Sequence, residues 1–245
     1  IQNAKYGDIF RSVAIVKAVI FDLDNTLAKI GQGMAQNDLM LLRQLEKQGV
    51  MTAICSGKTA DYLCGFARQT GLKRPVLLGE NGAIIQVGAE LPPKQFYSLP
   101  YSEKAKHTIA FLRNELNRIL PHIWYQPNMV GLTPFPSKPE EFDMIAECLE
   151  SNKAYMEDVT VYRHVDCFDI MPGSIDKRQG VKFMGEVLNV SPKDMIAVGD
   201  GINDYSMFEY AGVAIGIHVK ESGRVDKNFN TITEALEYIS VYISG

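Results

Sequence analysis

The segment AVIFDLDNTL, residues 18–27, is the part of the sequence that decides the fold. Its first four residues are apolar and rich in β-formers, and they lead directly into Asp22 and Asp24. Such a run is typical of a central parallel strand with functional groups at its carboxyl end. The apolar run extends back to Val13 with one break at Lys17, so we interpret Val13–Phe21 as a buried strand.

Helices and strands alternate after this strand. Leucines at helical spacing predict a helix over Asn37–Gln48, and the apolar residues 50–55 predict a second buried strand. Thr59 or Asp61 is suited to cap a following helix that ends near Gln69. A third short strand precedes residues 80–83, so the pattern predicts an α/β fold with a doubly wound parallel sheet.

The pattern changes between residues 84 and 172, where prolines and polar stretches are frequent. The spacing of apolar residues there predicts two helices and two strands, which are Lys104–Leu116, Pro139–Leu149, Thr160–Val165 and Cys167–Met171. We expect residues 84–172 to form a small α/β cap domain. It would be inserted into a core domain made of residues 1–83 and 173–245.

The core pattern resumes after residue 173. It predicts a helix at Gln179–Leu188, strands at Met195–Gly199 and Val213–Ile217, and a last helix opened by a capping box at Thr231–Glu234.

Composition excludes several classes of function. The 245 residues carry a formal net charge of -4 without a Lys/Arg-rich run, so we expect no nucleic-acid surface. No apolar run is long enough to cross a bilayer. The four cysteines form no C-x-x-C pair, which indicates free thiols in a reducing compartment and a cytoplasmic protein.

Two acidic clusters indicate a metal site. Asp22 and Asp24 are two positions apart, and carboxylates this close repel each other unless a cation neutralises them. The segment Gly199–Asp204, GDGIND, offers hard oxygen ligands that suit Mg²⁺ or Ca²⁺ but is too compact for an EF-hand. Alone, the first cluster is equally consistent with a solvated acidic turn, and the second with a structural loop.

Two further positions suit a phosphate group. Ser56-Gly57-Lys58 follows a predicted strand and precedes a helix, where a hydroxyl and backbone N–H groups form an anion cradle. Lys177 precedes another predicted helix and could hold phosphate as a point charge. Each signal alone is weak, because Ser-Gly turns and solvated lysines are common.

Together these motifs resemble the haloacid dehalogenase superfamily of phosphatases. The pattern DxDxT, then a serine after the next strand, then a lysine, then GDxxND spans nearly the whole chain. The resemblance implies a Rossmann-like core with a cap and a Mg²⁺-dependent phosphatase. It assigns Asp22 as the nucleophile that becomes an aspartyl phosphate, Asp24 as general acid/base, and Lys177 as a phosphate ligand that shields Asp22.

The same resemblance assigns the ligands. Mg²⁺ would be bound by Asp22, Asp200 and the backbone carbonyl of Asp24, with Asp204 supporting it. Ser56, Gly57, Lys177 and Asn203 would bind the phosphoryl group. Asn81 would support the site or simply form a turn.

The interval between Ser56 and Lys177 is much longer than a crossover needs, so the insert lies between these two motifs. This position resembles the C2-capped branch of the superfamily, and GDGIND resembles the Cof-like, type IIB subgroup of that branch. That subgroup includes sugar phosphatases, phosphoglycolate phosphatases and phosphomannomutases. Asn25 stands where many members have Gly, and Asn tolerates left-handed geometry. Arg178 stands where the subgroup usually has Gly after its Lys. Gly180 could shift the alignment with the family, so the register around Lys177 stays open.

The sequence thus predicts a phosphatase for small phosphate monoesters, with phosphoglycolate or a sugar phosphate as substrate and a monomeric or homodimeric state. A phosphomutase and a non-catalytic phosphate-binding protein are open alternatives, and fold alone does not decide between them. We expect structural roles for the four histidines, a solvated strand face for Arg163 and His164, and packing within the cap for Trp124 and Tyr125.

Overall fold

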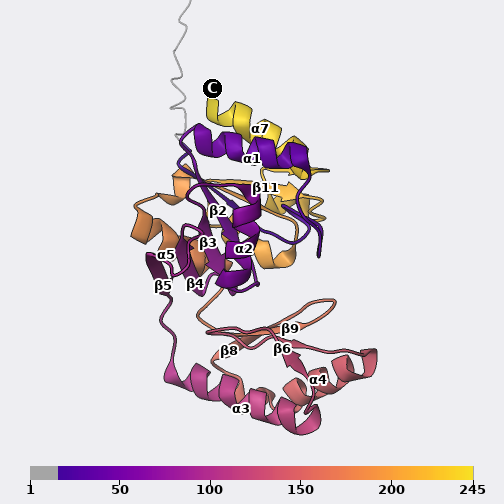
Figure 1. The fold of residues 1–245 in the computed structure, drawn as a ribbon. Coiled ribbons are helices and arrows are strands. Elements are labelled where there is room, and N and C mark those ends of the chain that lie inside the picture. The colour runs from indigo at the N-terminus through magenta and orange to yellow at the C-terminus, as the bar shows by residue number, and fades with distance from the viewer. Residues whose placement is uncertain (1–15, 245) are drawn as a thin grey trace, which may run out of the picture.

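The computed structural model describes residues 16–244, and its larger part is a core built on one eight-stranded sheet (Figure 1). The strand order is β12-β11-β10-β1-β2-β3-β4-β5. The strands are β1 (Ala18–Phe21), β2 (Met51–Cys55), β3 (Val76–Gly79), β4 (Ile84–Val87), β5 (Gln95–Ser98), β10 (Met195–Gly199), β11 (Val213–Ile217) and β12 (Lys227–Phe229). All neighbours pair in parallel except β3–β4 and β4–β5, which are antiparallel.

Helices cover both faces of this sheet. In β1, Val19 and Phe21 face a core shared with α1 (Gln36–Lys47), α2 (Ala60–Thr70) and α7 (Ile232–Ser244). The alternate residues Ala18 and Ile20 pack toward α5 (Lys177–Leu188) and α6 (Tyr205–Phe208). A strand buried on both faces needs apolar residues at every position, which explains the unbroken run AVIF. The doubly wound α/β fold is confirmed.

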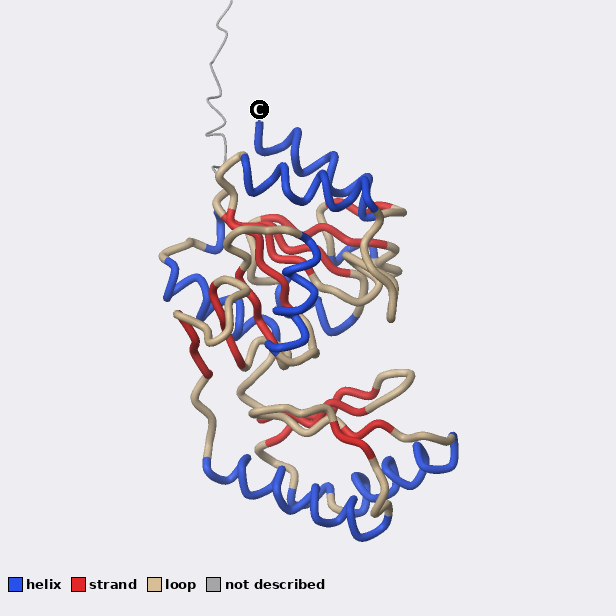
Figure 2. The backbone as a smooth tube through the Cα atoms, in the orientation of Figure 1, coloured by secondary structure: helices blue, strands red, loops and turns tan. Residues whose placement is uncertain are grey.

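The smaller part of the chain is a cap that lies beyond one end of the core sheet. Its helices α3 (Glu103–Ile119) and α4 (Pro139–Ser151) pack on short strands that complete the cap, namely β6 (Trp124–Tyr125), β7 (Pro134–Phe135), β8 (Val159–Arg163) and β9 (Phe168–Pro172). In Figures 1 and 2 the strands lie on the side of the cap toward the core, and the two helices lie on the far side.

The core extends further along the chain than the sequence suggested. Strands β4 and β5 pair with β3 as an antiparallel edge of the core sheet, whereas the cap was expected to begin at residue 84. The change of pattern at residue 84 therefore marks a change of strand direction. We propose a cap of residues 99–172. Residues 13–15 of the predicted first strand lie outside the described part of the chain.

One of the predicted caps and one cap that was not predicted fix the starts of two core helices. The Thr59 hydroxyl accepts a hydrogen bond from the backbone N–H of Tyr62 and opens α2. The Asp176 carboxylate accepts one from the N–H of Gln179, so α5 begins at Lys177, two residues earlier than expected. Within residues 16–244, no helix has both the length and the apolar character that crossing a membrane requires.

Candidate active site

Three neighbouring strands of the core sheet end in polar residues. β10, β1 and β2 are adjacent and parallel, and they are followed directly by Asp200, Asp22 and Ser56. Carboxyl ends of parallel strands open on one edge of the sheet, where crevices for ligands form. The sheet topology therefore brings residues far apart in sequence to one place.

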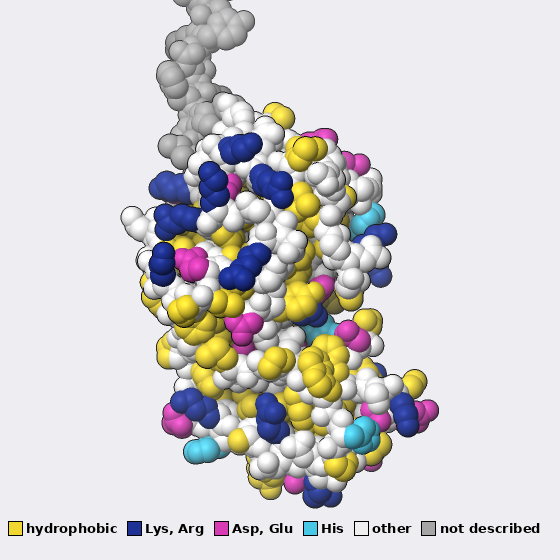
Figure 3. Space-filling model, in the orientation of Figure 1, with side chains coloured by type: hydrophobic (Ala, Val, Ile, Leu, Met, Phe, Trp, Pro, Cys, Tyr) yellow, Lys and Arg dark blue, Asp and Glu magenta, His cyan; other side chains and the backbone are white. Residues whose placement is uncertain are grey.

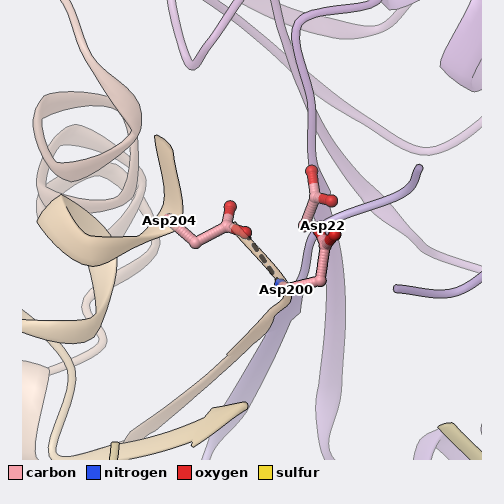
Figure 4. Close-up of side chains that lie close together, drawn as sticks. All are labelled: Asp22, Asp200 and Asp204. Carbon is pink, nitrogen blue, oxygen red and sulfur yellow. Dashed lines mark hydrogen bonds between the residues drawn. The ribbon is translucent and has the colours of Figure 1, made fainter. Parts of the chain in front are cut away.

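The carboxylates of Asp22, Asp200 and Asp204 form an acidic cluster at this edge. One oxygen from each lies within 4.8 Å of the others. Figure 4 shows Asp22 and Asp200 together at the ends of their strands, while Asp204 approaches from the loop after β10. Asp204 Oδ2 accepts hydrogen bonds of 3.0 Å from the backbone N–H groups of both Asp200 and Gly201, which fixes the loop around it.

Lys177 places one buried cation inside the cluster. Its Nζ lies 2.5 Å from Asp22 Oδ1 and 2.6 Å from Asp204 Oδ1, and its side chain is 1% exposed. The Asp176 cap fixes the start of α5, so the lysine projects from the first residue of the helix. The lysine that contacts the acidic cluster is therefore Lys177, the residue that the motif indicated.

The local charge favours a further cation. Burial raises the pKa of Asp22 to about 7, against the lowering effect of Lys177, and the carboxylate of Asp204 adds to the increase. Burial and Asp204 likewise raise the pKa of Asp200 to about 6. Although burial disfavours its charge, the two aspartates keep the pKa of Lys177 above its usual value. Three clustered carboxylates against one lysine fit a hard divalent ion bound through oxygen.

Asp24 lies beside this cluster and pairs with a lysine that the sequence analysis did not assign. Lys58 Nζ is 3.2 Å from Asp24 Oδ2, and both side chains are about one-quarter exposed, at 26% and 25%. Burial opposes the charge of Lys58, but Asp24 holds its pKa above the usual value. Asn25 has φ 63, so the left-handed geometry predicted for this position is present.

The Ser56-Gly57 turn lies against both the core and the cap. Ser56 is buried, and its hydroxyl oxygen accepts a 3.3 Å hydrogen bond from the N–H of Lys58. A Cβ at Gly57 would lie 2.9 Å from Asp169 Oδ2 of the cap, so a larger residue here would have to displace that carboxylate. Asn203 is half-buried in the loop that carries Asp204, and its side chain makes no hydrogen bond with the described residues.

A polar network holds the cap on this edge of the core. The buried Glu80 carboxylate, in the loop after β3, accepts hydrogen bonds from the N–H groups of Met129, Val130 and Gly131 at 2.7, 2.8 and 3.0 Å. The Asn81 amide donates to Asp169 Oδ2 at 3.0 Å. These contacts give Asn81 a defined role at the interface.

Asp169 is the centre of the cap half of this network. It accepts a 2.7 Å hydrogen bond from the Thr133 hydroxyl, and its Oδ2 lies 3.2 Å from His164 Nε2. Asp169 raises the pKa of His164, while His164 keeps that of Asp169 low in spite of burial. His164 is thus held by Asp169 near the Ser56-Gly57 turn. The prediction of a solvated strand face was wrong for this residue.

Sequence reasoning did not predict the pairing of Lys58 with Asp24 or any role for Glu80 and Asp169, because their partners lie in other segments of the chain. It also assigned Trp124 to cap packing, whereas the side chain is 58% exposed. A surface hollow of about 700 Å³ is lined by cap residues such as Lys138 and Arg163 and by none of the clustered carboxylates. That hollow is therefore separate from the acidic cluster at the sheet edge.

Comparison with known proteins agrees with this geometry. A family model described as haloacid dehalogenase-like hydrolase matches residues 19–133 and 128–233. A phosphoglycolate phosphatase of Methanopyrus kandleri is 27% identical over 201 residues, which cover 80% of this chain and 82% of that protein.

Solved structures share the fold. A haloacid dehalogenase-like hydrolase from Bacteroides thetaiotaomicron has a TM-score of 0.74 at 17% identity, covering 91% of this chain and 99% of its own. A sugar phosphatase of HAD subclass IIB has a TM-score of 0.66 at 17% identity, covering 92% and 100%.

Proposed function

Since this chain belongs to the haloacid dehalogenase-like hydrolase family of phosphatases, we propose that it hydrolyses small phosphate monoesters with Mg²⁺ and Asp22. The observation that carries the proposal is the buried cluster in which Lys177 bridges Asp22 and Asp204 beside Asp200. A nucleophilic carboxylate, a fixed cation and two further acids are the groups that this chemistry needs.

The first step forms a bond between Asp22 and phosphorus. One Asp22 oxygen is held by Lys177, and the other has no hydrogen-bond partner among the described residues. That second oxygen attacks the phosphorus of the substrate, the ester P–O bond breaks, and Asp24 gives a proton to the departing alkoxide. The product is an alcohol and an aspartyl phosphate.

The second step regenerates the carboxylate. Asp24 accepts a proton from water, the water oxygen attacks phosphorus, and the bond to Asp22 breaks to release inorganic phosphate. Lys58 Nζ lies 3.2 Å from Asp24 Oδ2 and holds this carboxylate in position.

The remaining site residues orient the phosphoryl group. Ser56 and the N–H groups of the following turn bind its oxygens, and Lys177 offsets its charge at the nucleophile. Asn203 assists from the opposite loop.

Asp22 and Asp200 would hold Mg²⁺ directly with the Asp24 carbonyl. Both Asp204 oxygens are engaged by Lys177 and backbone N–H groups, so Asp204 acts as a support. Bound Mg²⁺ would supply charge neutralisation between carboxylates and phosphate.

The substrate is a small soluble ester, because the cap covers the site and leaves little room for a macromolecule. One relative is a phosphoglycolate phosphatase, and one structural neighbour is a sugar phosphatase. Phosphoglycolate and sugar phosphates are both small phosphorylated metabolites, and we propose one of these two classes.

Phosphate release from an aryl phosphate, measured with Mg²⁺ and with EDTA, tests this proposal. We expect turnover that EDTA stops and that Asp22→Asn abolishes. The control is Asp143→Asn, an acid of the cap outside the cluster. Turnover that survives in Asp22→Asn would contradict the mechanism. Turnover that depends on a bisphosphate activator would indicate a phosphomutase instead.

A further inference from the structure

We propose that Trp124 and Phe135, here called the aromatic pair, form a platform for the leaving group of the substrate. The platform would select phosphate monoesters whose alcohol carries a ring with an apolar face, such as a sugar ring, over short acyclic esters. This inference rests on the proposed function of the same site and names the substrate class within it.

Strand alternation places the aromatic pair on the side of the cap that faces the core. Tyr125 points to the cap helices, because its hydroxyl donates a 3.0 Å hydrogen bond to Asn117 Oδ1 and its ring lies 4.7 Å from the Arg113 guanidinium. Successive strand side chains point to opposite faces. Trp124 therefore points away from the helices, and the cap strands lie between those helices and the core (Figure 2).

Gln126 shows how close this face is to the phosphate-binding turn. It follows Trp124 by two residues, so the two side chains share a face. Its Nε2 donates a 2.9 Å hydrogen bond to the backbone carbonyl of Gly57, the residue after Ser56. Two residues of strand span roughly 6–7 Å, about the length of a sugar ring. The leaving group of an ester bound at Ser56 would thus reach Trp124.

The geometry of the aromatic pair suits a flat or ring-shaped ligand. Trp124 and Phe135 are directly paired across β6 and β7, and their ring centroids are 5.2 Å apart with a 60° tilt. Trp124 keeps 58% of its surface exposed. Figure 3 shows hydrophobic side chains exposed on the cap beside its junction with the core. Aromatic faces bind ring C–H groups and other rings in offset or tilted geometry.

The polar side chains on the same face are already engaged. Gln126 bonds to Gly57, and Thr133 bonds to Asp169, which also accepts from Asn81. Among these side chains of the β6–β7 hairpin, Trp124 is the one that stays largely exposed. Contact with the aromatic pair would stabilise a bound ring that has an apolar face. The two-carbon leaving group of phosphoglycolate would be too short to make this contact.

The first test uses the fact that Trp124 is the only tryptophan in the chain. In the Asp22→Asn variant with Mg²⁺, titration with a hexose 6-phosphate should change the tryptophan fluorescence in a saturable way. Phosphoglycolate, which has no ring, should cause a much smaller change at saturation. No change with the ring ester, while it binds by calorimetry, would overturn the proposal.

The second test compares kinetics between variants. Trp124→Ala should raise KM for the hexose 6-phosphate roughly 3- to 10-fold with little change in kcat, and Trp124→Phe should recover most of the loss. The matched control is Tyr155→Ala, which removes a 66% exposed aromatic residue from the cap, paired with Phe111 of α3. That control should leave KM unchanged.

The two tests separate this inference from the proposed function. If wild type hydrolyses esters through Asp22 but Trp124→Ala changes KM equally for ring and acyclic esters, the platform is wrong and the phosphatase mechanism stands. If wild type hydrolyses nothing, the proposed function is wrong, and the fluorescence titration still decides the platform. A change of oligomeric state in Trp124→Ala without a change in KM would also overturn it.

Discussion

At the scale of single residues, Lys177 determines whether the acidic cluster can exist. It is the one buried cation that contacts both Asp22 and Asp204 within the described part of the chain. Removal of one partner from a buried ion pair leaves an uncompensated charge and costs more than the pair itself contributes. The structural and chemical roles of Lys177 are therefore linked.

We expect Lys177→Met to lower the free energy of unfolding by about 3–5 kcal/mol and to abolish turnover. The methionine fills similar space, so loss of charge is the main change. Denaturant unfolding in EDTA measures the effect, and Lys182→Met on the exposed side of α5 is the matched control. A loss of less than about 1 kcal/mol in the free energy of unfolding would mean that Lys177 is not needed to compensate the charge of the two aspartates.

The raised pKa values of Asp22 and Asp200 predict how stability depends on pH without metal. In the folded state these pKa values, about 7 and about 6, lie above the ordinary value of 3.8, so the folded state binds more protons than the unfolded state. The free energy of unfolding should then fall as pH rises from about 4 to about 7. A tenfold difference in proton affinity between the two states corresponds to about 1.4 kcal/mol.

Unfolding curves at several pH values, with EDTA and with Mg²⁺, measure this dependence. In EDTA, Asp22→Asn should make the free energy of unfolding depend less on pH, because the substitution removes the buried carboxylate. Mg²⁺ should have the same effect in wild type, because the ion offsets the charge of that carboxylate. If the free energy of unfolding falls equally with pH in all three conditions, groups other than Asp22 and Asp200 cause the pH dependence.

The order of residue types was enough to predict that four of the candidate residues lie together. Asp22, Asp200, Asp204 and Lys177 stand together in the structure as the motif order predicted. Glu80 was beyond prediction, because its partners are backbone N–H groups that lie about 50 residues further along the chain. Such contacts carry no signature in residue type.

At the scale of elements, the position of α5 decides where Lys177 lies. Gly180 packs against Gly82 of the loop after β3, and a Cβ at Gly180 would lie 2.4 Å from the Gly82 Cα. The helix can approach the loop this closely only because both residues are glycine. The first turn of α5 is thereby held against the end of the sheet.

We expect Gly180→Ala to displace the start of α5 and to lower both stability and turnover, since Lys177 moves with it. Gly65→Ala is the matched control, because Gly65 is also in a helix but has nothing within 4 Å of the added Cβ. That control should be neutral or slightly stabilising, as alanine favours helix. Thermal melts and kcat measure both, and equal behaviour of the two variants would contradict the packing argument.

Helices and strands were predictable where apolar periodicity was strong, as in β10 and α4. The edge of the sheet was less predictable. β4 and β5 form an antiparallel pair whose direction depends on the turns around Gly82 and Gly88, both at positive φ. Periodicity indicates a strand but not its neighbour, so the cap boundary was placed too early.

At the scale of the whole molecule, hydrogen bonds from three side chains join the cap to the core. Glu80 bonds three consecutive cap N–H groups, Asn81 bonds Asp169, and Gln126 bonds Gly57. All three contacts lie beside the phosphate-binding turn. The proposed function then predicts that at least part of this network opens when a substrate enters.

We expect Glu80→Ala to loosen the cap, because three N–H groups, two of them buried, lose their acceptor. Hydrogen exchange of the amides of residues 129–131 should become faster, and KM should rise more than kcat falls. Glu103→Gln, at an exposed position in the first turn of α3, is the control and should change neither. Unchanged exchange in Glu80→Ala would show that the cap is held by its other contacts.

The central claim is that Asp22 carries the phosphoryl group. The most direct measurement is acid quench of Asp24→Asn with an aryl phosphate and Mg²⁺, followed by mass spectrometry of the peptides. An aryl leaving group needs no proton from Asp24, whereas hydrolysis of the intermediate does need Asp24 as base, so a phosphoenzyme should accumulate. The account predicts phosphate on Asp22 and none in the Asp22→Asn, Asp24→Asn double variant. Phosphate on another residue, or release of aryl alcohol without any covalent intermediate, would contradict it.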